Sequence, residues 1–139
     1  MTFEQFFWIA HAAALVGWVA LLVRPGPAAV LVARWAAAVL AVGYTILFLF
    51  FTADASVLAS DYSLEGVGSF FAAPSTMLLG WVHYLAFDLF VGSWEAEEAH
   101  RLQMPRVLLV LCLPLTFLLG PLGLLVFLAA RAARNSIAS

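Results

Sequence analysis

Four ionisable side chains lie inside segments that are apolar enough to cross a bilayer: His11, Arg34, His83 and Asp88. A charge in hydrocarbon is costly, so such residues are rare and usually carry a function. Histidine and aspartate can each take up or release a proton, which makes His83 and Asp88 the candidate acid and base of a buried reaction. The chain contains no lysine, so a retinal Schiff base is excluded.

The composition indicates an integral membrane protein. Hydrophobic residues make up 65% of the chain and charged residues 10%, against about 45–50% and about 25% in soluble domains. The basic residues form no stripe, which excludes a nucleic-acid surface. The single cysteine, Cys112, excludes an internal disulfide and a CxxCH haem attachment, and we interpret it as a packing residue.

Four segments reach the length of about 20 apolar residues that a membrane span needs. A breaker, Arg24-Pro25-Gly26-Pro27, separates the first two, and prolines at 74 and 105 suit the starts of the last two. Two further prolines, at 114 and 121, should kink the fourth. The sequence therefore predicts a single all-α membrane domain with four transmembrane helices, at about 3–23, 28–51, 75–93 and 106–130.

The long connection at 52–74 mixes acidic and aromatic residues, so we expect an interfacial or re-entrant segment, with a surface loop as the alternative. With four spans, both termini share a face with this segment. Arginines are more numerous at the opposite face, which we therefore place in the cytoplasm. Arginine in place of lysine suggests a GC-rich genome and thus a bacterial inner membrane. The arginines compared are Arg24, Arg34, Arg101 and Arg106 against Arg131 and Arg134.

Depth along the spans predicts a polar pocket near the N-terminal face. His11 and His83 each lie about 10–12 Å into a span from that face, at about 1.5 Å per residue, so they could face each other. Asp54 and Glu65 could reach down from the connecting segment above them. We include His11, Asp54 and Glu65 among the candidate substrate-binding residues.

Arg34 and Asp88 share a second depth, nearer the other face. A buried charge should find its opposite, which predicts a structural ion pair between the second and third spans. The alternatives are that Arg34 extends to the interface without a partner and that Asp88 is a purely structural charge.

The third span has two specialised faces. His83 and Asp88 are five positions apart, so they point about 140° away from each other on a helix. One stripe consists of Trp81, Tyr84 and Asp88, and the other of His83, Phe87 and Phe90. The following charges we interpret as a solvated loop without a metal site: Glu95, Glu97, Glu98 and His100.

Two blocks carry a family resemblance. They are GWVHYLAFDLFVGSW, from Gly80 to Trp94, and PLTFLLGPLGLL, from Pro114 to Leu125. Together they resemble the abscisic-acid-deficient-four-like family of small four-span membrane proteins. Plant members are implicated in neoxanthin synthesis, in which an epoxide end group of violaxanthin becomes an allene. The resemblance therefore implies an isomerase acting on a carotenoid or a related isoprenoid.

Such a reaction needs a proton donor at the epoxide oxygen and a base for the neighbouring polyene carbon, but no redox cofactor. His83 or Asp88 could fill either role, since burial keeps a carboxylic acid able to donate a proton. Aromatic side chains could pack along the polyene. The candidate substrate-binding residues are His11, Trp81, Tyr84, Phe87, Glu65 and Asp54.

Two other functions fit the same residues. The protein could hold a carotenoid, quinone or other lipid without changing it. It could also carry electrons through a haem b whose axial ligands are His11 and His83. A chain of this size has enough lipid-facing surface to form a homo-oligomer, and its glycines mark candidate close contacts between helices.

Overall fold

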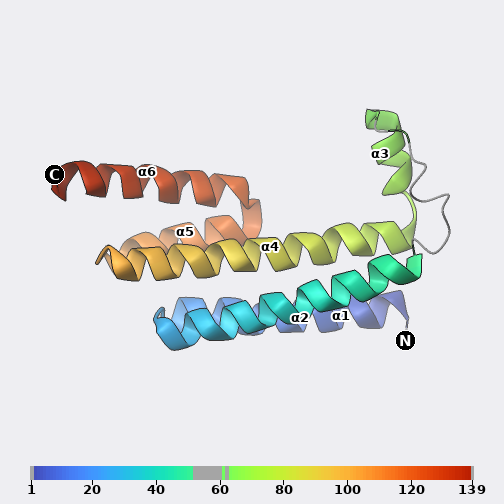
Figure 1. Cartoon of the computed structure of the whole chain (residues 1–139), viewed down its shortest axis with the longest axis horizontal. Coiled ribbons are helices and arrows are strands. Elements are labelled where there is room, and N and C mark those ends of the chain that lie inside the picture. The colour runs from blue at the N-terminus through green and yellow to red at the C-terminus, as the bar shows by residue number, and fades with distance from the viewer. Residues whose placement is uncertain (1, 52–60, 62, 139) are drawn as a thin grey trace.

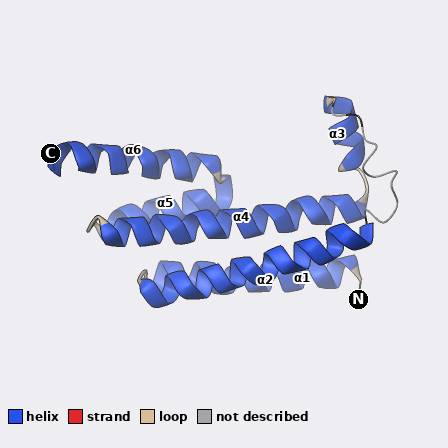
Figure 2. Cartoon of the chain, in the orientation of Figure 1, coloured by secondary structure: helices blue, strands red, loops and turns tan. Residues whose placement is uncertain are grey.

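The computed structural model describes residues 2–51, 61 and 63–138, and this part of the chain is almost entirely helical (Figure 2). Three long helices lie side by side and form the body of the molecule (Figure 1). A short helix, α3, follows the second of them, and two helices at the C-terminal end complete the chain. The elements are α1 (Phe3–Val23), α2 (Pro27–Phe51), α3 (Leu64–Phe70), α4 (Pro74–Arg101), α5 (Arg106–Leu119) and α6 (Pro121–Ala138).

Local sequence sets where these helices begin. Thr2 and Gln5 form a reciprocal capping box at the start of α1, which satisfies two backbone N–H groups that the helix leaves free. Pro74 occupies the first turn of α4, where its fixed φ and missing N–H cost nothing. The predicted first span, 3–23, has the same bounds as α1, and α2 begins one residue before the predicted start of the second span.

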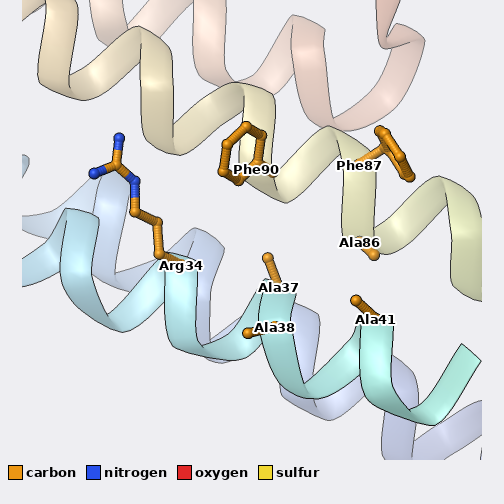
Figure 3. Close-up of a pocket in the computed structure, with 7 residues that line it drawn as sticks. All are labelled: Arg34, Ala37, Ala38, Ala41, Ala86, Phe87 and Phe90. Atoms are coloured by element: carbon orange, nitrogen blue, oxygen red, sulfur yellow. The ribbon is translucent and has the colours of Figure 1, made fainter. Parts of the chain in front are cut away.

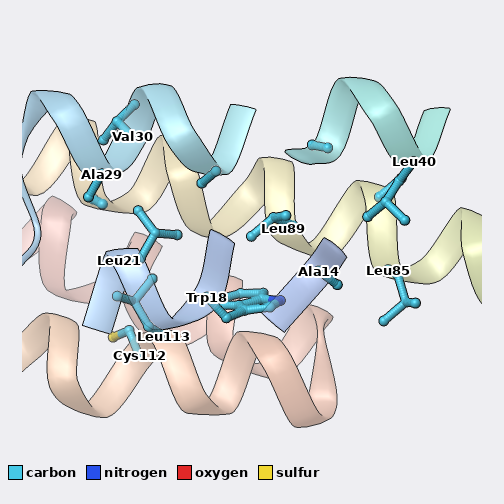
Figure 4. Close-up of a cluster of buried hydrophobic side chains, with 14 of the residues drawn as sticks. Ala14, Trp18, Leu21, Ala29, Val30, Leu40, Leu85, Leu89, Cys112 and Leu113 are labelled. Atoms are coloured by element: carbon cyan, nitrogen blue, oxygen red, sulfur yellow. The ribbon is translucent and has the colours of Figure 1, made fainter. Parts of the chain in front are cut away.

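The core lies where α1, α2 and α4 meet and continues onto α5 (Figure 4). Gly17 lets α1 approach α4 closely, because a Cβ there would lie 2.7 Å from Cδ2 of Leu89. Trp18 fills the space next to Leu113 on α5, and both side chains are buried. Small residues thus bring the helices together and one large ring fills the remaining volume.

The predicted fourth span is two helices. α5 ends at Leu119 after 14 residues, or about 21 Å, which is short of the roughly 30 Å hydrocarbon core. Gly120 has a φ of +41° and Pro121 begins α6, which folds back along α5 (Figure 1). Pro114 lies inside α5 and does not end it, so the reversal follows from Gly120, whose positive φ turns the chain, together with Pro121, which has no N–H to continue the hydrogen-bond ladder. Among the described residues, the helices long and apolar enough to cross a membrane are α1, α2 and α4; the four-span count is not confirmed.

This reversal changes the position of the C-terminus. The N-terminus and α3 lie at one end of the bundle, which we call the N-terminal end (Figure 1). The C-terminus lies at the opposite end, with the α1–α2 and α4–α5 turns, and we call this the C-terminal end. The prediction that both termini share a face is therefore wrong, because the fourth hydrophobic segment turns back within its length.

Candidate functional site

α4 carries the two stripes that its sequence predicts, and they face different surroundings. Trp81 and Tyr84 have their ring centroids 5.4 Å apart on one side of the helix. His83 and Phe87 stack at 4.5 Å on the other. The first stripe lies toward α1 and α5, and the second lies beside α2.

A groove of about 440 Å³ runs between α1 and α4 at the N-terminal end. The groove is open because α5 covers only part of α4. Gly120, which directly follows α5, lies against Asp88 in the middle of α4. The groove lies on the turns of α4 that precede Asp88, where α5 is no longer present. Aromatic residues four apart on α1 form one wall and residues of the first two turns of α4 form the other. The lining residues are Phe3, Glu4, Phe7, Pro74, Met77, Leu78 and Trp81.

A continuous track of rings leads from this groove along α4. His11 packs on Phe7 with centroids 4.2 Å apart and stacks on Trp81 at 5.4 Å. The Nε1–H of Trp81 donates to Nε2 of His11 at 3.2 Å, so the proton of the neutral His11 ring lies on Nδ1, 3.0 Å from the Phe7 carbonyl oxygen. Both nitrogens of His11 are thus committed to bonds within the protein. This histidine fixes the orientation of Trp81.

Tyr84 and Asp88 close the inner end of the track. The Tyr84 hydroxyl donates to the carbonyl oxygen of Phe117 at 2.7 Å and also interacts with the Asp88 carboxylate. The carboxylate lies against Gly120, where a Cβ would be only 3.2 Å from both oxygens. One of those oxygens, Oδ2, is buried and has no hydrogen-bond partner among the described residues. A buried acceptor without a partner is uncommon in a folded protein, which makes Asp88 a candidate functional residue.

His83 lies outside this arrangement. Its ring is exposed on the outer face of α4, 5.7 Å from that of Tyr44 on α2 and stacked on Phe87. Next to it, a second groove of about 410 Å³ runs between α2 and α4 (Figure 3). Alanines form its floor, and Phe87, Phe90 and Arg34 form its sides.

The structure does not bring the two predicted histidines together. His11 contacts Trp81 and His83 contacts Tyr44, and two positions on a helix are about 200° apart, so these contacts lie on opposite faces of α4. This geometry does not support a haem held between them. His83 and Asp88 are also on different faces, as their spacing predicts, so they do not act in one pocket.

The predicted Arg34–Asp88 ion pair is wrong. Arg34 instead pairs with Glu97, through contacts of 2.5 and 3.1 Å. Glu97 continues the outer stripe of α4, two helical turns beyond Phe90, and so faces α2, whereas Asp88 faces the α5–α6 turn. Of the two acidic residues proposed to reach down from the connecting segment, Glu65 is exposed on α3, and Asp54 lies outside the described residues.

Comparison with known proteins gives one result. The family model described as ABA DEFICIENT 4-like matches residues 5–127. The chain belongs to this family. The matched region contains the aromatic track, Asp88 and the α5–α6 turn. No curated protein and no solved structure matches.

In this family member, α4 continues as one helix to Arg101, well beyond the predicted end of the third span at residue 93. Glu95 therefore lies in the helix and is fully buried, two turns beyond Asp88 on the same face. The Thr116 hydroxyl lies 2.9 and 3.0 Å from its two oxygens. The signal in the sequence was the absence of glycine and proline between 93 and 101, which favours a continued helix.

A second acidic residue on this face holds α6 in place. Glu98 accepts hydrogen bonds from Arg101 and from Arg131 of α6, each at 2.7 Å. Phe127, also on α6, is fully buried with its ring 5.5 Å from that of Trp94. The α5–α6 hairpin thus covers the C-terminal half of α4, whereas residues of the N-terminal half line the groove.

Proposed function

We propose that this protein binds the end group of a carotenoid or a related polyene in the α1–α4 groove and isomerises it by acid–base chemistry. Its membership of the ABA DEFICIENT 4-like family suggests a role in a carotenoid pathway related to neoxanthin. The observation that carries the proposal is the carboxylate oxygen of Asp88 without a hydrogen-bond partner among the described residues, next to the Tyr84 hydroxyl and two helical turns along α4 from Trp81, which lines the groove. A flat conjugated chain packs well along such rings.

In the proposed reaction, Asp88 takes a proton from the polyene carbon next to the epoxide ring. The electron pair of that C–H bond becomes a new double bond of the allene, and the epoxide C–O bond breaks. The released oxygen takes the hydroxyl proton of Tyr84, which turns away from the Phe117 carbonyl to reach it. Tyr84 then recovers the proton that Asp88 removed. All atoms balance and no oxidant or reductant is consumed, so the reaction is an isomerisation.

The test uses the full chain in liposomes supplied with violaxanthin, whose two end groups carry epoxides. We expect an allenic product of unchanged mass, separated by chromatography. Asp88→Asn should abolish it and Tyr84→Phe should reduce it, while Glu65→Gln, an exposed acidic residue on α3, serves as the matched control. Full product formation by Asp88→Asn would overturn the assignment.

A second candidate function is the binding of a carotenoid without conversion. It is favoured by the commitment of both His11 nitrogens and of the Tyr84 hydroxyl to bonds within the protein. Violaxanthin that stays bound to the protein and is recovered unchanged would support this function and overturn the isomerase.

We further propose that the C-terminal end faces the cytoplasm. The α5–α6 hairpin brings the last arginines to the same end as the others, so the positive-inside rule now points one way. Cysteines introduced at Thr2 and Ser136 should react with a membrane-impermeant thiol reagent from outside and from inside the cell, respectively. The reverse pattern would contradict this orientation. The arginines are Arg24, Arg34, Arg101, Arg106, Arg131 and Arg134.

A further inference from the structure

A long apolar groove runs between α1 and α2 at the surface of the bundle and ends at an arginine. Its volume is about 760 Å³, and Arg24 is the one lining residue that is not apolar. Val16, Val19 and Val23 form one wall, and each keeps more than half of its surface exposed. The groove shares no lining residue with the α1–α4 groove. A ligand bound here is therefore independent of the proposed function.

The length of this groove corresponds to one leaflet of a bilayer. Arg24 lies at the α1–α2 turn, at the C-terminal end of the bundle, and Ala12 lines the inner end of the groove (Figure 1). At about 1.5 Å per residue, these two positions are about 18 Å apart along α1. Half of a hydrocarbon core is about 15 Å thick. A lipid of the leaflet at this end can thus place its headgroup at Arg24 and one chain in the groove.

A second arginine lies at the mouth of the groove. Nη2 of Arg106, the first residue of α5, donates to the carbonyl oxygen of Val23 at 2.6 Å. A guanidinium group has five N–H donors, and among the described residues this is the only hydrogen bond from the Arg106 side chain. The Arg24 side chain has none within the described part of the chain. Both residues are exposed, so two positive charges and most of their donors are free to bind a ligand.

The described carboxylates at this end of the bundle already have partners. Glu97 and Glu98 form ion pairs with other arginines, and Glu95 is buried against α5. The charges of Arg24 and Arg106 are therefore not balanced by the described protein, which favours an anion at the mouth of the groove. An arginine also binds a phosphate group well, because its planar fork of donors matches the phosphate oxygens.

The other two grooves lack this combination. Arg34 lines the α2–α4 groove, but its charge is paired with Glu97. The charged residue that lines the α1–α4 groove is Glu4, which is acidic. A long apolar groove and unpaired positive charge therefore meet between α1 and α2.

We propose that the α1–α2 groove binds a phospholipid whose headgroup has a net negative charge. One acyl chain lies in the groove, and the phosphate accepts hydrogen bonds from Arg24 and Arg106. Basic sites between membrane helices bind anionic headgroups in this way. Arg106 also lines a pocket of about 180 Å³ with His100 and Gln103, which offers polar contacts to the rest of the headgroup. A choline headgroup fits less well, because its ammonium group cancels the charge of the phosphate.

Native mass spectrometry of the full chain in detergent micelles tests the headgroup contact, with dioleoyl phosphatidylglycerol and dioleoyl phosphatidylcholine as probes. Wild type should bind phosphatidylglycerol more tightly. Arg24→Gln should weaken its binding about fivefold and leave phosphatidylcholine unchanged, and Arg24→Lys should retain most of the preference. Arg134→Gln, at an exposed position on α6, removes the same charge and is the matched control. Equal losses in Arg24→Gln and Arg134→Gln, or no loss in Arg24→Gln, would overturn the proposal.

The same measurement tests the chain contact. Ala12→Phe fills the inner end of the groove and should weaken phosphatidylglycerol binding although both arginines remain. Val39→Phe, exposed on α2 outside the lining residues, is its control. Inorganic phosphate should displace the lipid no better than chloride at equal ionic strength. Unchanged binding in Ala12→Phe would overturn the groove as the site of the chain, and specific displacement by phosphate would show a site for the free anion instead.

Discussion

The two faces of α4 carry similar residue types in different surroundings. Each has aromatic rings and at least one titratable group: Trp81, Tyr84 and Asp88 lie on the inner face, and His83 and Phe87 on the outer. The inner face is closed at one end by the α5–α6 turn, so its carboxylate is partly buried with a free oxygen. The outer face is exposed. Among the described residues, the aromatic rings that pack against His83 are those of Tyr44 and Phe87. A titratable residue in an apolar helix is therefore a stronger candidate for catalysis when a neighbouring segment buries it than when its side chain is exposed.

The largest difference in the rate of allene formation should be between substitutions of Asp88 and of His83. Asp88→Asn keeps the shape of the side chain but removes the base, and should lower allene formation by about 100-fold or more. His83→Gln should leave the rate within about twofold, because an exposed ring on the outer face touches none of the proposed reacting atoms. Rates in liposomes with equal amounts of each variant test this. A larger loss for His83→Gln than for Asp88→Asn would reverse the assignment of the two faces.

The next effect concerns the covered half of the inner face. Thr116→Val removes the donor that lies against buried Glu95, and should lower the free energy of unfolding by roughly 1–3 kcal/mol. Thr116→Ser retains the hydroxyl and is the matched control. Unfolding in detergent measures both. Equal stability of the valine and serine variants would show that this hydrogen bond does not hold α5 on α4.

The turn that closes the groove should be sensitive to a single methyl group. Gly120→Ala places a Cβ 3.2 Å from both Asp88 oxygens at a residue with φ +41°, and should cost about 1–2 kcal/mol of stability. Allene formation should fall as well, because the carboxylate must shift. Gly68→Ala, where a Cβ would meet nothing within 4 Å, controls for the loss of glycine. Unchanged activity in Gly120→Ala would show that the turn does not position Asp88.

The smallest effect belongs to the outer face. The Arg34–Glu97 pair is partly exposed, with side-chain exposures of 37% and 52%, so its coupling energy should be only about 0.2–1 kcal/mol. Arg34→Gln and Glu97→Gln should be less than additive in unfolding experiments, while Arg34→Gln and Asp88→Asn should add. Coupling of Arg34 to Asp88 instead would restore the ion pair predicted from depth.

Hydropathy predicted the first helices well and the last one poorly. Residues 3–23 and the region from 28 to 51 are apolar throughout and bounded by breakers, so length and composition determine them. Residues 106–130 are equally apolar, and hydropathy contains no information on whether the chain reverses at Gly120. The end of α4 was missed for the opposite reason: Glu95 and Glu98 look like solvated charges until Thr116 and Arg131 are placed against them.

Contacts within one helix were predictable, and contacts between helices were not. The stripe of Trp81, Tyr84 and Asp88 follows from 3.6 residues per turn alone. Depth fixes the level of a residue in the bundle but not the direction in which it points. For that reason depth wrongly assigned Arg34 to Asp88, whereas its partner in the structure is Glu97.

Photolabelling can show whether the inner face of α4 holds the ligand. A diazirine analogue of violaxanthin would be activated on the reconstituted full chain, with and without excess violaxanthin, and the adducts mapped by mass spectrometry. We expect the adducts removed by competition to lie on Phe7, Met77 and Trp81. Competition-sensitive adducts on Phe87 and Phe90, with none in the α1–α4 groove, would contradict it.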